Sequence, residues 1–526
     1  MISILRSRRR LGRNDRTGGQ WKLGAVGLGA VALYTQTLGW AMQNSTYNVW
    51  GVLVIFPFLV AISLPILWKV TKHDVVALPG LLSVALVTKL LASLVRYLVV
   101  FQVYGGTADA TGYHTIGTSI ANEFYAGRLS VLELIPRGQG TQFIQQLTGL
   151  VYAIIGPTKL GGFMVFSWMG FWGLFLMYRA ALIGFPEIAV KRYAMLLFFA
   201  PSLLFWPSSI GKESWLMMTL GLTFYGAARL IVQMPGGIVV TTLGAALTAL
   251  VRPHVTAVAV VSLGAALVFR RSRHRASLLS PIRKIAVLAL LAVGISIAIS
   301  QAAQFLGPDA SGKGTSLSAV FDRVQRNTSQ GGSAIDVKRP NNPLLYPQAF
   351  FTVMFRPTLI EVRSTTSAIS ALETTALLAL FVISWGRLKE VPSLLFRRPY
   401  LLFCLLYAGI FAFAWSSIGN LGIIARQRVL AWPFMMVFLA LPKLDRHLAK
   451  APNVRQLYGS PTRGLMAEQP TAATSLLTSL GSSADVGVHL LGAADHRGDV
   501  EFGPSKSSSL AHAPSQLGVM DQTKQG

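Results

Sequence analysis

Residues 49–68 read VWGVLVIFPFLVAISLPILW and contain no charged side chain. About twenty apolar residues in an α-helix are enough to cross the hydrocarbon core of a bilayer, which is about 30 Å thick. A second uncharged run, IAVLALLAVGISIAISQAAQFL, occupies residues 285–306. Neither run alternates apolar with polar residues, as the strands of an outer-membrane barrel do. Both runs therefore predict membrane-spanning helices.

The composition of the whole chain supports the same prediction. Of its 526 residues, 52% are hydrophobic and only 13% are charged, whereas soluble domains contain roughly 25% charged residues. The net charge is +27, but the basic residues cluster in short segments between apolar runs, such as RSRRRLGR (6–13), RRSRHR (270–275) and FRR (396–398). Clusters of this kind are typical of cytoplasmic loops, so the charge does not indicate nucleic-acid binding. The single cysteine, Cys404, excludes an intramolecular disulfide or a thiolate metal cluster.

Placing the basic loops on the cytoplasmic side predicts an all-α polytopic membrane protein with about 11–13 transmembrane helices. The membrane domain covers 23–443, with external loops at 104–159 and 307–365. A basic cytoplasmic N-terminus (1–22) precedes it, and a cytoplasmic tail (444–526), rich in Ser, Gly, Ala and Pro, is predicted to be disordered. The expected spans are 23–42, 49–70, 75–103, 160–183, 193–208, 213–233, 237–251, 255–269, 284–306, 367–385, 400–417 and 429–442.

This topology leaves residues 143–156, FIQQLTGLVYAIIG, on the outer side of the membrane. The segment is too short to span comfortably and contains paired glutamines, so it is predicted to be an amphipathic helix on the outer surface. If it spanned instead, every later loop would change sides and the cluster at 270–275 would lie outside, against the charge rule.

Many ionisable residues gather on the predicted outer side. They are Asp109, Tyr113, His114, Glu123, Lys212, Glu213, Arg252, His254, Arg356, Glu361, Arg363, Glu373, Arg426 and Arg428. Such groups are costly near hydrocarbon unless they are paired or hydrated, so they predict a cavity among the external loops. Arginine and lysine bind phosphate or carboxylate, and a carboxylate in a loop can act as a general base. The set suits transfer from a lipid-linked phosphate donor to an acceptor hydroxyl.

Four stretches also carry a resemblance to known proteins. GGTADATGYHTIG (105–117) resembles the acidic first catalytic loop of GT-C-type membrane glycosyltransferases, which use polyprenyl-linked sugars. PSLLFWPSSIGKES (201–214), FFTVMFRPTLIEV (350–362) and GNLGIIARQRVLAWPF (419–434) resemble bacterial membrane proteins of exopolysaccharide and cell-wall glycan clusters. The last stretch is also similar to polysaccharide polymerases of the O-antigen polymerase kind. The resemblance covers roughly 100–435.

The resemblance implies a GT-C-like multi-pass enzyme in the bacterial cytoplasmic membrane. A polyprenyl-phosphate-linked sugar would be the donor and a glycan or lipid the acceptor, in cell-envelope or exopolysaccharide synthesis. Asp109 is predicted to be the catalytic base. The predicted substrate- or phosphate-binding residues are His114, Lys212, Glu213, Arg252, His254, Arg356, Arg426 and Arg428.

Two features differ from the usual GT-C pattern and leave the need for a divalent metal open. The acidic loop follows the third predicted helix rather than the first. Asp109 is followed by Ala110, whereas many of these enzymes carry paired acids. A second metal-binding carboxylate would have to come from Glu123 or Glu213, so no metal ligand and no cofactor is assigned.

Several of these residues also have a structural interpretation. Asp109 could cap the helix that follows it, since aspartate is a favoured N-cap. Lys212 and Glu213 could form a local ion pair. Arg426 and Arg428 could extend to the membrane interface along their apolar stems.

Two other function classes remain open at this point. One is a transporter or flippase for a lipid-linked glycan, which would need polar groups that continue across the membrane. Lys89 and Arg96 are the residues that hint at this, because they are seven apart on one face of the span 75–103. The other is a non-enzymatic scaffold of an envelope assembly complex.

Overall fold

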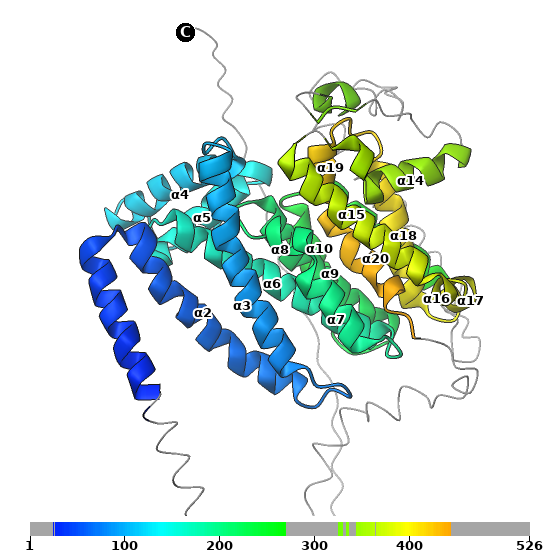
Figure 1. Cartoon of the computed structure of the whole chain (residues 1–526), viewed down its shortest axis with the longest axis horizontal. Coiled ribbons are helices and arrows are strands. Elements are labelled where there is room, and N and C mark those ends of the chain that lie inside the picture. Colours follow the sequence, from blue (N-terminus) through cyan, green and yellow to red (C-terminus); the bar gives the residue numbers. More distant parts are fainter. Residues whose placement is uncertain are drawn as a thin grey trace, which may run out of the picture. The chain divides into compact units, whose positions relative to one another are not determined.

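The described part of the chain is built from helices joined by turns (Figure 1). The computed structural model describes residues 25, 27–269, 324–329, 333–335, 343–362 and 364–442. Within these ranges the only extended pairing is one isolated β-bridge between Ala334 and Asn420. The all-α part of the predicted fold class is therefore confirmed. The basic N-terminus, the predicted span 284–306, most of the loop 307–365, Arg363 and the tail 444–526 lie outside the described residues.

Three helices are long and apolar enough to cross a membrane: α2 (Tyr47–Thr71), α3 (Pro79–Leu98) extended by the π-helical turn η1 (Val99–Val103), and α6 (Lys159–Gly184). A fourth candidate is the pair Leu421–Leu430 and Trp432–Leu439, which is bent by 65°. The other apolar helices of the described ranges are shorter, with 10–17 residues. Within the described residues, which do not include the predicted span 284–306, three helices, or four with the bent pair, are long and apolar enough to be full spans; the count of 11–13 stays a prediction.

Proline explains one difference from the predicted spans. A continuous span was predicted at 193–208, but α7 (Val190–Phe199) ends one residue before Ala200, and α8 (Pro201–Phe205) follows. Ala200 has an extended conformation, with ψ of 125°, because a proline ring disfavours the helical conformation of the residue before it.

The remaining helices follow the predicted order, and α4, α14, α17 and α19 lie outside the predicted spans. They are α4 (Asp109–Tyr125), α5 (Gly140–Ile155), α9 (Lys212–Ile231), α10 (Gly237–Ala249), α11 (Pro253–Val268), α14 (Tyr346–Phe355), α15 (Thr365–Ile383), α16 (Trp385–Leu388), α17 (Val391–Leu395), α18 (Pro399–Trp415), α19 (Leu421–Gln427) and α20 (Trp432–Leu439). Short 3₁₀ turns are η3 (Pro343–Leu345), η4 (Leu359–Glu361) and η5 (Arg428–Leu430).

Helix α9 packs against α6 on one side and α10 on another, and small residues let these helices approach closely. A Cβ atom on Gly173 of α6 would collide with the main-chain carbonyl of Met217 on α9. On the other side of α9, a Cβ atom on Gly244 of α10 would lie 2.5 Å from the backbone nitrogen of Thr223. Glycine at these crossings allows backbone-to-backbone packing of the kind found in membrane helix bundles.

Connections that were predicted to share one side of the membrane do lie together. The Arg179 guanidinium at the end of α6 donates to the Asp74 carboxylate at 2.6 Å, in the turn between α2 and α3. At the same end, Arg192 of α7 donates to the Ser384 hydroxyl after α15 at 2.7 Å. Two pairs of connections that were predicted for the same side therefore lie together. That this end is cytoplasmic stays a prediction.

Helix α5 begins and ends at the opposite end of the bundle, which we call the α4–α5 end. Its first residue, Gly140, donates its N–H to the carbonyl of Leu250 at 2.8 Å, in the turn after α10. Its last residue, Ile155, accepts a hydrogen bond from the hydroxyl of Tyr47, where α2 begins. With both ends at the same end of the bundle, α5 does not cross it.

The backbone between α7 and α9 is interrupted inside the bundle, and buried side chains satisfy it. Lys89 of α3 donates from Nζ to the carbonyls of Leu203 and Leu204 at 2.7 and 3.0 Å. Glu373 of α15 accepts from the backbone N–H of Ser202 at 2.8 Å. Irregular backbone at membrane depth is tolerated only when the protein satisfies its polar groups. These contacts therefore fix the segment that leads into α9.

Candidate functional site

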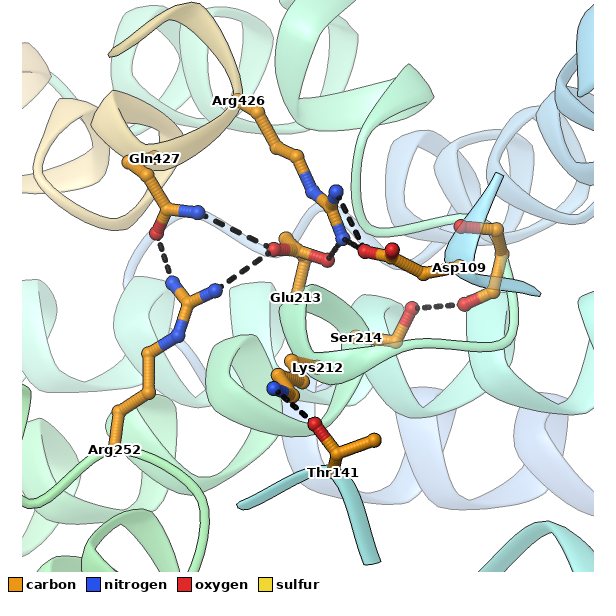
Figure 2. Close-up of polar contacts among 9 residues, drawn as sticks. Asp109, Thr141, Lys212, Glu213, Ser214, Arg252, Arg426 and Gln427 are labelled. Atoms are coloured by element: carbon orange, nitrogen blue, oxygen red, sulfur yellow. Dashed lines mark hydrogen bonds and ion pairs between the residues drawn. The ribbon is translucent and has the colours of Figure 1, made fainter. Parts of the chain in front are cut away.

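Four elements far apart in the sequence meet at the α4–α5 end. Helix α4 begins at Asp109, α9 begins at Lys212, Arg252 precedes α11, and α19 ends at Gln427. Figure 2 shows their side chains turned toward Glu213 in the first turn of α9. We call Asp109, Lys212, Glu213, Arg252, Arg426 and Gln427 the Glu213 cluster.

The carboxylate of Glu213 lies between two guanidiniums. Its Oε2 accepts from Nη2 of Arg426 at 2.8 Å, and its Oε1 accepts from Nη2 of Arg252 at 3.3 Å. The Glu213 side chain is only 3% exposed. A buried carboxylate requires such partners, because an unpaired buried charge costs several kcal/mol.

Asp109 is the exposed carboxylate of the cluster. Its Oδ2 accepts from both Nη1 and Nη2 of Arg426 at 3.0 Å, and its side chain is 59% exposed. One guanidinium thus bridges Asp109 and Glu213. The interpretation of Asp109 as a helix cap is wrong: the N-cap of α4 is Ala108, and the Asp109 carboxylate is directed to another helix instead.

Lys212 borders the cluster from the first residue of α9. Its Nζ donates to the hydroxyl of Thr141 at 2.8 Å (Figure 2). Burial and the neighbouring Arg252 lower the pKa of the Lys212 amine. The suggested local ion pair with Glu213 is replaced by this arrangement, since both Glu213 oxygens are taken by arginines of other elements.

Two further residues at the cluster were not predicted to bind substrate, although Tyr113 belongs to the outer polar set named from the sequence. Gln427 accepts a hydrogen bond from Arg252 and holds its own Nε2 3.5 Å from the Glu213 carboxylate. Tyr113 lies one turn after Asp109 on the same face of α4 and is 3% exposed. Burial and the charges of Asp109 and Glu213 raise the pKa of Tyr113 to about 12, so its phenol stays protonated at neutral pH. The only signal for Gln427 was its place between two arginines.

Arg428 does not join Arg426 in the cluster. It is fully buried, donates to the hydroxyl of Ser370 at 2.8 Å and to the carbonyl of Arg356, and lies 4.7 Å over the ring of Trp432. Two residues along a helix rotate a side chain by about 200°, so Arg426 and Arg428 face different parts of the bundle. This geometry therefore does not support a ligand shared by Arg426 and Arg428.

Arg356 is also directed away from the cluster, into local structure. Its Nε donates to Glu361 at 2.7 Å, and the same carboxylate accepts from the backbone N–H of Thr358 at 2.8 Å. These bonds close the turn η4.

The second carboxylate beside Asp109 is Glu213. Glu123, the other candidate, pairs on the surface with Arg128, whose Nη2 donates to Glu123 at 2.8 Å. Arg426 stands between the carboxylates of Asp109 and Glu213. Among the described residues, no group of three or more His, Cys, Asp or Glu side chains could hold a metal ion.

The two predicted histidines have different surroundings. The ring of His254 packs against that of Trp415 in a tilted arrangement, with the ring centres 5.4 Å apart. The charges of Arg252 and Lys212 act on His254, so it borders the cluster. His114 is half-buried, and its Nδ1 shares a hydrogen bond of 2.8 Å with the Tyr152 hydroxyl.

Acidification is expected to destabilise the protein through His114. Burial, together with the charge of Lys159, lowers the pKa of His114 to about 4. The unfolded chain takes up this proton near pH 6.5, so the contribution to stability is present above about pH 6.5 and is lost as the pH falls toward 4. His114→Gln is expected to flatten the dependence of the melting temperature on pH between about 6.5 and 4. His73→Gln, in an exposed turn, serves as the control, and equal slopes in wild type and His114→Gln would contradict the prediction.

The Glu213 cluster combines three cations with two carboxylates, and the side chains of Asp109 and Arg426 are 59% and 28% exposed. Guanidiniums held in this way can bind an oxyanion through two oxygens at once. A carboxylate open to solvent can accept a proton.

Comparison with protein-family models, with curated proteins and with solved structures finds no match to this chain.

Proposed function

We propose that the protein is a GT-C-like membrane glycosyltransferase, or a related polysaccharide polymerase, that uses a polyprenyl-phosphate-linked sugar on the extracytoplasmic face. The observation that carries the proposal is the convergence of Asp109, Glu213, Arg252 and Arg426 from four separate elements at one end of the bundle. Paired charges beside membrane-spanning helices are costly to build and mark functional sites. We also propose that the lipid-linked donor binds in a vestibule at this end of the bundle.

Arg252, Arg426 and Lys212 supply the positive charge for a departing phosphate. As the bond between the sugar C1 and the phosphate oxygen breaks, its electron pair stays on the phosphate, and fixed donors stabilise the charge that develops. Glu213 orients the two guanidiniums by binding both. Because these side chains provide the charge, the proposal requires no metal ion.

Asp109 acts as the base in this scheme. An acceptor hydroxyl forms the new bond to C1 and transfers its proton to the Asp109 carboxylate, which is the more exposed of the two acids. The contact with Arg426 fixes the direction of that carboxylate. General-base catalysis of this kind contributes about 100- to 10,000-fold to rate.

Asp109→Asn is expected to lower product formation by about 100-fold or more while binding of the lipid donor is retained. The measurement is glycan product in a deletion strain that expresses the variant at wild-type level. Glu123→Gln, a surface carboxylate change away from the cluster, is the matched control and is expected to behave like wild type. An unchanged product with Asp109→Asn would contradict the role of Asp109.

The transporter and scaffold alternatives predict other outcomes. Purified protein that moves labelled lipid across liposomes without forming a covalent product would favour a transporter. Lys89 was one of the two residues that hinted at a polar path across the membrane. Because it donates to the backbone carbonyls of Leu203 and Leu204, it gives the transporter alternative less support than the sequence suggested. Silent alanine substitutions throughout the Glu213 cluster would favour a scaffold.

A further inference from the structure

Arg96 places a second layer of positive charge beside the Glu213 cluster. It lies in α3, two turns after Lys89, and is 6% exposed. Its guanidinium carbon is 4.5 Å from the ring centre of Phe205 and 4.8 Å from that of Trp206. Both rings belong to the stretch between α7 and α9 that continues into Glu213, so Arg96 packs against the segment that leads into the cluster.

The guanidinium of Arg96 has hydrogen-bonding capacity left over. Its Nε and Nη1 are buried, and neither donates a hydrogen bond within the part of the chain that the structure describes. Its charge nevertheless interacts with those of Asp109, Glu213 and Arg426. Burying donors without acceptors is unfavourable, so an arginine kept in this state indicates a ligand that supplies the acceptors.

Lys89 and Ser93, on the same face of α3, show what a purely structural polar residue looks like here. Lys89 donates to two backbone carbonyls, and the Ser93 hydroxyl donates to the carbonyl of Leu90 at 2.6 Å. Both therefore have partners inside the protein. Arg96 rests on aromatic faces instead, and its Nε and Nη1 have no partner within the described ranges.

The charge balance points to the same kind of ligand. The described residues of this region include four cations and two carboxylates, so two positive charges are not balanced. The cations are Arg96, Lys212, Arg252 and Arg426, and the carboxylates are those of Asp109 and Glu213. A phosphate or pyrophosphate group would neutralise the excess and accept from several of these donors together.

We propose that Arg96 is a further binding residue of this site and donates from Nε and Nη1 to the phosphate oxygens of a lipid-linked pyrophosphate or phosphate. The lipid part of the ligand is inferred from position, since Arg96 lies within a helix long and apolar enough to cross a membrane. The class of ligand in this inference is taken from the proposed function.

The test compares wild type, Arg96→Met and Ser93→Ala as purified full-length proteins in detergent, with farnesyl pyrophosphate and inorganic pyrophosphate as probes. Wild type is expected to bind farnesyl pyrophosphate more tightly than inorganic pyrophosphate. Arg96→Met is expected to weaken farnesyl pyrophosphate binding by about 10- to 100-fold, as the loss of hydrogen bonds to a charged group does. Ser93→Ala is expected to bind like wild type.

The melting temperature without ligand separates binding from a structural role. Methionine retains the apolar contacts with Phe205 and Trp206 and removes the unsatisfied donors, so Arg96→Met is expected to melt at or above the wild-type temperature. Wild-type affinity in Arg96→Met, with or without a lower melting temperature, would overturn the inference. Equal affinity of wild type for both probes would overturn its lipid part.

The outcome for the proposed function is read separately. If Arg96→Met loses affinity while Asp109→Asn leaves glycan product unchanged, Arg96 stands as a binding residue and the transferase mechanism fails. If Arg96→Met binds normally while Asp109→Asn abolishes product, the mechanism stands and the role of Arg96 fails. Wild type that binds neither probe would contradict both.

Discussion

Glu213→Gln is expected to lower the free energy of unfolding by about 3 kcal/mol and to abolish product formation. Removing one partner of a buried ion pair costs about 3–5 kcal/mol, because the remaining charge stays buried without compensation. Here the loss affects two guanidiniums, since Arg252 and Arg426 both bind this carboxylate. The glutamine amide retains the shape of glutamate and one acceptor oxygen, which places the expected cost at the lower end of that range.

Thermal or denaturant unfolding of the purified protein in detergent measures the stability effect, and glycan product measures the second effect. Glu123→Gln makes the same chemical change in a surface pair with Arg128 and is expected to leave stability and product unchanged, because exposed ion pairs contribute little. A Glu213→Gln protein that unfolds like wild type would show that the carboxylate does not hold the two arginines together.

Gly173→Val is expected to prevent formation of the folded bundle. The added Cβ atom would collide with the main-chain carbonyl of Met217, and the contact is reciprocal: a Cβ atom on Gly221 would collide with the Gly173 backbone. Backbone atoms cannot move aside as a flexible side chain can, so α6 and α9 would have to separate along their whole contact. The start of α9, and with it Glu213, would then leave its partners.

The measurement is the yield of monodisperse protein after extraction and size-exclusion chromatography, which is expected to fall to background for Gly173→Val. Gly80→Ala is the matched control, since a Cβ atom at Gly80, in the first turn of α3, meets nothing within 4 Å. A normal yield of folded Gly173→Val would mean that α6 and α9 can pack further apart than they do here.

Much of the helical architecture could be predicted because its signals are local. The predicted spans 213–233 and 400–417 correspond closely to α9 and α18, since an uninterrupted apolar run has few alternatives to a helix. The break at Pro201 inside the predicted span 193–208 was missed, although proline gives a local signal. Helix α4 was expected only as a helix that Asp109 could cap, and its bounds were not predicted because its residues are mixed in polarity and lack a strong apolar period.

The candidate site could be predicted only as a set of residue types. Asp109, Glu213, Arg252 and Arg426 were all named from charge and predicted side, and the structure brings them together. Their pairing depends on how distant helices pack, which no local pattern encodes. Arg428 was grouped with Arg426 because both are basic and lie close in sequence, although residues two apart on a helix face different directions.

The bridge from Arg426 to Asp109 and Glu213 has a consequence for biosynthesis. Its two acids are made 317 and 213 residues before the arginine that joins them. While the chain is synthesised from its N-terminus, Arg252 is the first partner available to Glu213. Asp109 has no partner in the cluster until Arg426 of α19 has been made. The last helices to be inserted therefore complete the charge pairing of the first ones. A defect in their insertion would leave an acid without its partner at the start of α4, far away in sequence.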